Sequence, residues 1–405
     1  MIVMDLKQLR AELRQEHKDI LAYWTRYAPD PVHGGFYGRV NYQNQPDPNA
    51  EKGIVLNARI LWTFSAALRE TQHEEYRSIA DQAFQYIKTY FVDPEYGGIY
   101  WSVDATGKPK NALKHLYGQA FTLYGLSEYV RATKSEPALA LAKEVFQNMV
   151  KHAYDPKKGG FVEALARDWS PATDYIISKY DNQEIKTMNT HLHILESFTC
   201  LYHVWPDKSV AEQMRGMLHM FQIHIIDPTT YRMNLFMDMN WKVRRTAVSY
   251  GHDIEASWLL PEAADLLAAK NPADKPLQKA FQHIGVKMAR AASTGYDPTD
   301  GGMNYELEPD GHLNKERSWW VLAEAMVGFM NAYQLTHEKP FLDKSIKSWE
   351  FTKKYLLDRQ NGEWYMGVTG DHTIVGKDKI SMWKCPYHNS RACLEMLERL
   401  DHLHG

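Results

Sequence analysis

The chain has 405 residues, 44% of them hydrophobic, which is enough to bury a large core. Its formal net charge is −3, and it has neither a basic stripe nor a run of about 18 apolar residues, so nucleic-acid binding and a membrane span are not expected. The spacing of its cysteines (Cys200, Cys385 and Cys393) fits neither a disulfide framework nor a zinc site, and the start lacks the pattern of a signal peptide. These features predict a cytoplasmic protein.

A phrase of the form Asp-Pro-x-x-Gly-Gly recurs along the chain. A fixed period indicates a repeated supersecondary unit. Asp-Pro and Gly-Gly are turn signals, and the residues after them suit a short extended segment. The phrase stands at Asp30, Asp93, Asp155 and Asp297 and, in degenerate form, at Asp227 and Asp358, so that successive copies in chain order are 63, 62, 72, 70 and 61 residues apart.

Between these turns, apolar residues at helical spacing predict twelve helices. Each repeat then contains two helices and one turn, and six pairs that close on themselves form an (α/α)6 barrel, an all-α fold with short hairpin-like segments in its loops. No linker divides the chain, so we predict one domain over residues 1–405, with an open helical solenoid as the alternative. In chain order the predicted helices span 6–27, 56–68, 79–91, 116–130, 139–150, 192–204, 214–226, 254–267, 277–289, 319–333, 341–355 and 393–403.

Two histidines stand where inner helices are predicted to begin, at the end of the barrel where a cavity is expected. His252 shares a helix face with Glu255, and a position near a helix N-terminus lowers the pKa of an imidazole and keeps it usable as a base. The alternative is a helix-capping His252 with Glu255 as its buried partner. His388 follows Pro386, a residue typical of a helix start.

The pair His191 and His193 also falls on a predicted inner helix. The two side chains point about 200° apart, so only one is expected to face the cavity. No Glu-x-x-His motif and no Cys partner follows at ligand spacing, so we predict no metal site. No glycine-rich dinucleotide or phosphate loop is present either, which predicts that no nucleotide cofactor binds.

Three further inner helices carry candidate binding residues. Arg59 lies within an otherwise apolar helix and needs an anion or an aromatic ring to face, unless it forms a structural salt bridge. Trp320 and Glu324 share a face and suit sugar stacking and a hydroxyl acceptor, unless the aromatic residues are simply core. Tyr117 begins another inner helix and is expected to face the same cavity.

Taken together, these segments resemble the cellobiose 2-epimerases, within the larger N-acylglucosamine 2-epimerase superfamily. The resemblance covers essentially the whole chain and rests on Leu56-Asn-Ala-Arg-Ile-Leu-Trp-Thr-Phe, Met188-Asn-Thr-His-Leu-His, Val204-Trp-Pro, Gly251-His-Asp-Ile-Glu-Ala-Ser-Trp-Leu-Leu, Gly328-Phe-Met-Asn-Ala-Tyr-Gln and Pro386-Tyr-His-Asn. It implies an (α/α)6 barrel without a cofactor. It also implies that His252 and His388 are the acid/base pair and that His193, rather than His191, is the third active-site histidine. The sugar site that it implies is lined by Arg59, Tyr117, Asp181, Asn189, Glu255, Trp258, Trp320, Glu324 and Trp383.

The resemblance implies interconversion of the glucose and mannose configurations at C2 of the reducing-end sugar of β-1,4-linked disaccharides, such as cellobiose, or lactose to epilactose. The reaction would proceed by deprotonation and reprotonation through a cis-enediolate. In this scheme Glu255 orients His252, while Trp320 and Trp383 stack on the sugar. The alternative is a mannose 2-epimerase or mannose isomerase that acts on free monosaccharides.

Two other classes of function fit parts of the sequence. A glycoside hydrolase needs two carboxylates about 5–9 Å apart, for which Glu255 and Glu324 could be proposed, but histidines dominate the inner helix starts. A non-catalytic carbohydrate-binding scaffold would explain the aromatic residues but not the histidines and the arginine. We expect a small-molecule sugar as the binding partner, and a monomer or a weak homodimer.

Overall fold

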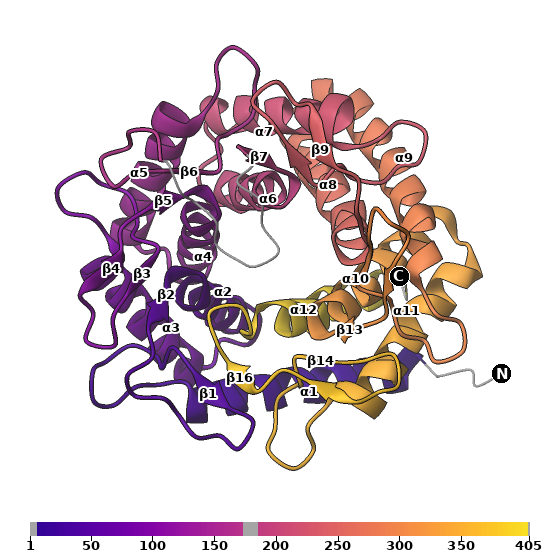
Figure 1. Ribbon diagram of the computed structural model, residues 1–405, viewed down its shortest axis with the longest axis horizontal. Coiled ribbons are helices and arrows are strands. Elements are labelled where there is room, and N and C mark those ends of the chain that lie inside the picture. The colour runs from indigo at the N-terminus through magenta and orange to yellow at the C-terminus, as the bar shows by residue number, and fades with distance from the viewer. Residues whose placement is uncertain (1–5, 173–184, 404–405) are drawn as a thin grey trace.

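The computed structural model describes residues 6–172 and 185–403, which form two concentric rings of helices (Figure 1). The inner ring consists of α2 (Ile54–Thr71), α4 (Leu116–Thr133), α6 (Met188–Val204), α8 (Tyr250–Lys270), α10 (Trp319–Thr336) and α12 (Tyr387–His402). The outer ring consists of α1 (Leu6–Tyr27), α3 (Glu74–Tyr86), α5 (Glu136–Ala153), α7 (Lys208–Met220), α9 (Lys275–Ala292) and α11 (Lys339–Phe351).

The two rings differ in how much of each helix is buried, as their sequences dictate. The outer helix α3 buries Tyr76, Ile79 and Ala83, which are three and four residues apart and form one apolar stripe against the inner ring. The inner helix α10 is buried continuously from Trp319 to Ala332, because it is covered on all sides. No helix in the described part of the chain is long and apolar enough to cross a membrane.

The inner ring is closed. Each inner helix contacts the next, and α12 contacts α2, while the first outer helix, α1, packs against α12. The N- and C-terminal repeats are also joined by strands, since Val40 in β1 (Val40–Asn41) pairs with Ile380 in β16 (Asp378–Ile380). The predicted (α/α)6 barrel is therefore confirmed, and the open solenoid is excluded.

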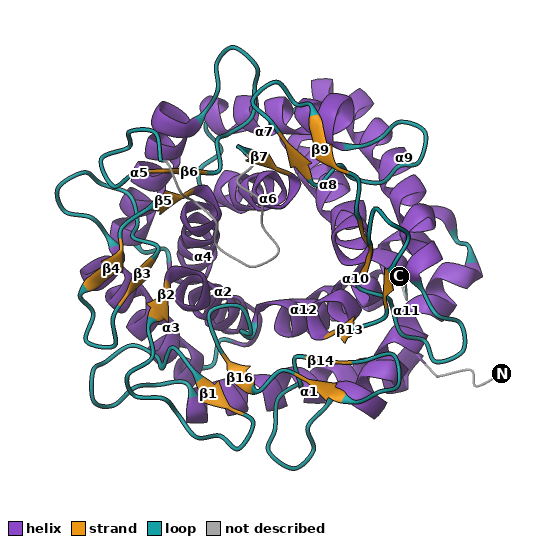
Figure 2. Ribbon diagram, in the orientation of Figure 1, coloured by secondary structure: helices purple, strands orange, loops and turns teal. Residues whose placement is uncertain are grey.

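Short antiparallel sheets connect neighbouring repeats around the ring (Figure 2). The strand immediately before an inner helix pairs with the strand that follows the Asp-Pro turn of the next repeat, as β2 does with β3. Besides β1 and β16, the strands are β2 (Lys52–Gly53), β3 (Ser102–Val103), β4 (Pro109–Asn111), β5 (Lys114–His115), β6 (Ala164–Leu165), β7 (Lys186–Thr187), β8 (Phe236–Met237), β9 (Val243–Arg245), β10 (Val248–Ser249), β11 (Glu306–Leu307), β12 (Leu313–Asn314), β13 (Arg317–Ser318), β14 (Gly367–Val368) and β15 (Ile374–Val375).

The recurring aspartate explains the Asp-Pro-x-x-Gly-Gly phrase. Oδ1 of Asp30 accepts hydrogen bonds from the backbone N–H groups of Val32 and His33, which closes the turn, and Oδ2 accepts from the buried Nζ of Lys52 at 2.7 Å. Lys52 is the first residue of β2, so the turn is tied to the strand that leads into the inner helix. The same ion pair recurs as Lys114–Asp93 at 2.9 Å, Lys186–Asp155 at 2.9 Å, Arg317–Asp297 at 3.1 Å and Lys379–Asp358 at 3.0 Å, whereas Val248 takes this strand position in the repeat of Asp227.

Candidate active site

A cavity of about 580 Å³ lies at the end of the barrel where the inner helices begin. All six inner helices contribute to its wall, because each presents side chains from its first two turns, and the preceding strands complete the wall. Nine of the residues predicted from the sequence lie in this wall, namely Arg59, Tyr117, Asn189, His193, His252, Glu255, Trp320, Trp383 and His388.

His252 and His388 both lie close to one indole ring, that of Trp320. The ring centroid of Trp320 is 4.8 Å from that of His252 and 5.7 Å from that of His388. His252 is the third residue of α8, and His388 is the second residue of α12. Two residues more than 130 positions apart in the sequence are thus brought together in the cavity wall.

The imidazole of His388 is held by a buried carboxylate. Its Nδ1 lies 2.7 Å from Oε1 of Glu324, so Nδ1–H donates and Nε2 is left as the unprotonated nitrogen. Burial lowers the pKa of His388 to about 3, even though Glu324 acts in the opposite direction. Burial alone would raise the pKa of Glu324, but Arg391 and His388 hold it below its usual value. His388 is therefore a neutral base at pH 7.

His252 is held differently from our expectation. Its Nδ1 lies 2.7 Å from Oγ of Ser249, and burial together with the neighbouring His193 and His388 lowers its pKa to about 3. We expected Glu255 to orient this imidazole, but Oε1 of Glu255 accepts a hydrogen bond from Arg391 instead. The expectation was wrong because the guanidinium, which is buried between several helices, attracts the carboxyl group away from the histidine.

The structure places His193, and not His191, in the cavity wall. Nδ1 of His193 lies 2.8 Å from Oε2 of Glu196, one helical turn further on, and burial lowers the pKa of the imidazole. His191 uses both ring nitrogens within the fold, since Nδ1 donates to the carbonyl of Thr187 and Nε2 accepts from the backbone N–H of Phe161. His191 thus fixes a turn and has no nitrogen free for a substrate.

Arg59 is a buried cation that faces rings rather than acids. It forms no ion pair with a carboxylate among the residues that the structure describes. Nη2 donates to the hydroxyl of Tyr117 at 2.9 Å, and the guanidinium lies 4.1 Å from the centroid of Phe121 and 5.0 Å from that of Tyr387. The site therefore offers a positive charge to any anion that forms in the cavity.

Asn189 and Trp383 complete the polar and aromatic parts of the wall. Oδ1 of Asn189 is buried and has no hydrogen-bond partner within the described residues, which leaves an acceptor for a sugar hydroxyl. The indole of Trp383 lies 5.8 Å from the ring of Tyr117. Such amphipathic rings suit the apolar face of a sugar.

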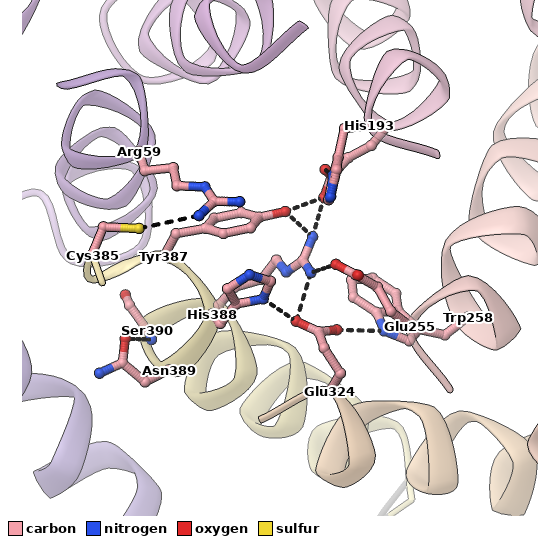
Figure 3. Close-up of polar contacts among 12 residues, drawn as sticks. Arg59, His193, Glu255, Trp258, Glu324, Cys385, Tyr387, His388, Asn389 and Ser390 are labelled. Carbon is pink, nitrogen blue, oxygen red and sulfur yellow. Dashed lines mark hydrogen bonds and ion pairs between the residues drawn. The ribbon is translucent and has the colours of Figure 1, made fainter. Parts of the chain in front are cut away.

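Two of the predicted sugar-site residues lie one layer below the cavity. Glu324 and Trp258 are both 1% exposed and are not part of its wall. Nε1 of Trp258 donates to Oε2 of Glu324 at 3.0 Å, so the indole supports the carboxylate that holds His388 (Figure 3). Asp181 lies outside the described residues.

Sequence reasoning missed the residues that support the three histidines. Ser249, Glu196 and Arg391 are each three positions from a site histidine, on the same helical face or at its start. This three-residue spacing was the one signal in the sequence that could have identified them as partners of the histidines. Glu163 was also missed; it lines the cavity and accepts hydrogen bonds from the hydroxyl of Thr187 at 2.7 Å.

One group of side chains has the composition of a metal site. Ligand atoms of Glu255, Glu324 and His388 lie within 4.8 Å of one another. However, Nη2 of Arg391 donates to both carboxyl groups, at 2.9 and 2.8 Å, so a guanidinium already provides the positive charge there.

Comparison with known proteins places this geometry in a family. Residues 35–392 match the family model of N-acylglucosamine 2-epimerase (GlcNAc 2-epimerase). The chain is 43% identical to a cellobiose 2-epimerase of Bacteroides fragilis over 96% of this chain and 98% of that protein. The structure of cellobiose 2-epimerase from Spirochaeta thermophila superimposes with a TM-score of 0.92 at 38% identity, covering 99% of this chain and 98% of that one. A D-mannose isomerase of Marinomonas mediterranea is more distant, at 22% identity over 94% of this chain.

The barrel and its histidine-lined cavity are those of a sugar-isomerising enzyme. The chain belongs to the N-acylglucosamine 2-epimerase family. Both the family and the enzyme class, an isomerase, were predicted from the sequence, and both predictions are confirmed.

Proposed function

We propose that this protein interconverts the glucose and mannose configurations at C2 of the reducing-end sugar of β-1,4-linked disaccharides, including cellobiose and lactose. The observation that carries the proposal is the pair of neutral imidazoles, His252 and His388, which both lie close to Trp320 in the wall of a cavity that is also lined by the unpaired cation of Arg59. The full-length similarity to proteins named cellobiose 2-epimerase supports a disaccharide as the substrate.

The first step opens the sugar ring. The hydrogen on C2 is acidic only when C1 is a free aldehyde, so the hemiacetal must open before C2 can react. Ring opening moves a proton from the O1 hydroxyl to O5, and His193 is the group assigned to this transfer. Its Nδ1–H is held by Glu196, which leaves Nε2 to accept and return the proton.

The second step removes the proton from C2. Either His252 or His388, according to the direction of reaction, accepts H2 on its unprotonated nitrogen and becomes an imidazolium. The electron pair of the C–H bond moves into a cis-enediolate with its negative charge on O1. Arg59 stabilises this anion, because a buried guanidinium that is already held in the cavity wall needs no reorganisation to face the new charge.

The third step returns a proton to the opposite face of C2. The other imidazole of the pair donates this proton after taking it from solvent within the substrate complex, where the enediolate charge favours the imidazolium form, and the first imidazole releases the proton from C2 to solvent. Donation from the opposite face inverts C2, and the roles of the two histidines exchange in the reverse direction. The two apparent pKa values of such a pair belong to the pair and not to one residue.

Turnover in deuterated water tests the reaction. We expect deuterium at C2 of the epimerised product, and we expect His252→Ala and His388→Ala each to lose on the order of 10² in rate. His203→Gln is a matched control, since His203 lies on α6 with His193 but is not part of the cavity wall. A product without deuterium would contradict proton transfer at C2.

Incubation with single sugars tests the substrate. Lactose should give epilactose, and cellobiose should give its C2 epimer, as resolved by chromatography. Interconversion of free glucose, mannose or fructose, with inert disaccharides, would instead favour a mannose 2-epimerase or mannose isomerase. Release of monosaccharides from cellobiose would favour a glycoside hydrolase.

The proposal also covers the domain organisation, the cellular compartment, the cofactor requirement and the oligomeric state of the enzyme. We propose that residues 1–405 act as one catalytic domain, supported by the contact between α12 and α2 that closes the ring. A reducing, cytoplasmic compartment is supported by Cys200, Cys385 and Cys393, which are buried and unpaired. We further propose that the enzyme works without cofactor or metal, as a monomer or a weak homodimer.

A further inference from the structure

Arg391 is the common anchor of three carboxyl groups around the cavity. It lies on the first turns of α12, three residues after His388, and is 1% exposed. Its Nη1 donates to Oε1 of Glu196, and its Nη2 donates to Oε1 of Glu255 at 2.9 Å and to Oε1 of Glu324 at 2.8 Å. One guanidinium therefore joins side chains from α6, α8 and α10 to α12.

The anchored carboxyl groups are those that support the proton-transfer groups. Glu324 holds Nδ1 of His388, and Glu196 holds Nδ1 of His193. Glu255 forms part of the cavity wall, and its Oε2 is buried without a hydrogen-bond partner within the described residues. A shift of this guanidinium would thus move two imidazoles and one cavity carboxyl group together.

Glu255 and Glu324 accept hydrogen bonds from the same Nη2 of Arg391. Burial together with Glu324 raises the pKa of Glu255 well above its usual value, whereas Arg391 and His388 hold the pKa of Glu324 below its usual value against the effect of burial. The guanidinium of Arg391 is therefore the cation that compensates the carboxyl groups behind the cavity.

We propose that Arg391 is a positioning residue for proton transfer: its guanidinium holds the carboxylates that anchor His193 and His388, and so fixes both imidazoles in the cavity wall. The inference rests on the proposed function. It assigns Arg391 no contact with the substrate, because its guanidinium is enclosed by Glu196, Glu255, Glu324 and the rings of Trp258 and Tyr387.

The positioning role of Arg391 can be measured through the titration of His388. The charged and titratable groups around this imidazole come from five elements, so their effects must be separated by substitution. Besides Arg391 on its own helix, they are Arg59 on α2, His193 and Glu196 on α6, His252 and Glu255 on α8, and Glu324 on α10.

The experiment compares Arg391→Met and Arg391→Lys with Arg399→Met. Arg399 is a matched control, because it lies two turns further along α12 and its guanidinium also faces Trp258, at 5.8 Å, but it contacts Asn331 and Gln334 and none of the carboxyl groups behind the cavity. For each variant, kcat and KM are measured against pH with lactose. The titration of His388 is followed by NMR in the sugar-free protein.

We expect Arg391→Met to lower kcat at least about ten-fold with a smaller change in KM. Removing the cation should raise the pKa of His388, so both its NMR titration and the acid limb of kcat/KM should move up by about one pH unit or more. Arg391→Lys keeps the charge but loses the fork of two donors, so its acid limb should stay near that of the unchanged protein while kcat falls. Arg399→Met should retain the acid limb and the His388 titration of the unchanged protein.

The failures of the two proposals are distinguishable. If the unchanged protein epimerises no sugar, the proposed function fails, and the NMR titration of His388 still tests Arg391. If the unchanged protein is active and Arg391→Met keeps its acid limb and its His388 titration, the positioning role is overturned. If Arg391→Met does not fold, Arg391→Lys provides the test. An unchanged kcat in Arg391→Lys would also overturn the positioning role.

Discussion

The two imidazoles proposed for proton transfer are anchored by unlike groups. His388 is held by the carboxylate of Glu324, which can only accept, whereas His252 is held by the hydroxyl of Ser249, which can donate or accept. Glu324 therefore selects one tautomer of His388. The hydroxyl of Ser249 can rotate and follow His252 as that imidazole gains and loses a proton.

This difference predicts the effect of removing the hydroxyl. Ser249→Ala should lower kcat about five- to ten-fold, because one neutral hydrogen bond contributes about 1 kcal/mol. Ser249→Thr keeps the hydroxyl and should recover most of the rate. Initial rates with lactose at several pH values measure both variants; an alanine variant with unchanged kcat would show that Ser249 does not assist His252.

The lowered pKa values predict the pH dependence of the reaction. The base must be neutral, and burial lowers the pKa of both His252 and His388 to about 3, below the ordinary value of about 6.5. Activity is lost only as the pH falls through this lowered pKa, because the imidazole is then protonated and cannot act as a base. We therefore expect kcat/KM to show no fall near pH 6.5 and to persist to about pH 5. An acid limb centred at about 6.5 would mean that the base is solvated in the free enzyme.

At the residue scale, the histidines were recognised from the sequence, but the hydrogen bonds that anchor them were not, although Glu324 itself was a candidate. Glu324 stands 64 positions from His388, and Arg391 stands 195 positions from Glu196. Local spacing cannot reveal such pairs, because closure of the barrel brings them together. The three residues that stand one helical turn from a histidine, such as Glu196 beside His193, could have been found from spacing alone.

At the scale of elements, the apolar period finds the helices but misses the first turns of two that carry site histidines. It identifies 319–333 and 6–27 closely, whereas α8 begins at Tyr250 rather than at residue 254, and α12 begins at Tyr387, directly after Pro386 as the proline indicated, rather than at residue 393. The first turns of these two helices hold His252 and His388 among polar neighbours. Polar functional residues on an inward face interrupt the apolar pattern that marks a helix.

The buried ion pairs of the turns carry a prediction about stability. Lys52→Met leaves the buried carboxylate of Asp30 without its cation and should lower the free energy of unfolding by about 3–5 kcal/mol. Lys114→Met should lower it by less, because Arg167 also pairs with Asp93, at 2.9 and 3.0 Å. Denaturant titration of both variants measures the difference. Equal losses would show that Arg167 does not compensate.

At the scale of the whole molecule, closure distinguishes this barrel from an array of repeats. The period of the Asp-Pro turns indicates six units but does not say whether the first meets the last. The pairing of Val40 with Ile380 and the packing of α1 against α12 provide that contact. Both contacts join opposite ends of the chain, so no local pattern in the sequence reveals them.

A closed ring should unfold as one cooperative unit, whereas an open array of repeats can lose its terminal repeats first. Trp24 on α1 tests this at the contact between the ends of the chain, since its side chain is fully buried and its Nε1 donates to Oε2 of Glu363 at 2.6 Å. Trp24→Ala should lower the free energy of unfolding by about 3–5 kcal/mol.

In a closed ring the transitions of this variant, followed by far-ultraviolet circular dichroism and by tryptophan fluorescence, should shift together and keep one common midpoint. If α1 instead released the last repeat independently, the two midpoints would separate, and epimerase activity would be lost with the first transition because His388 lies on α12.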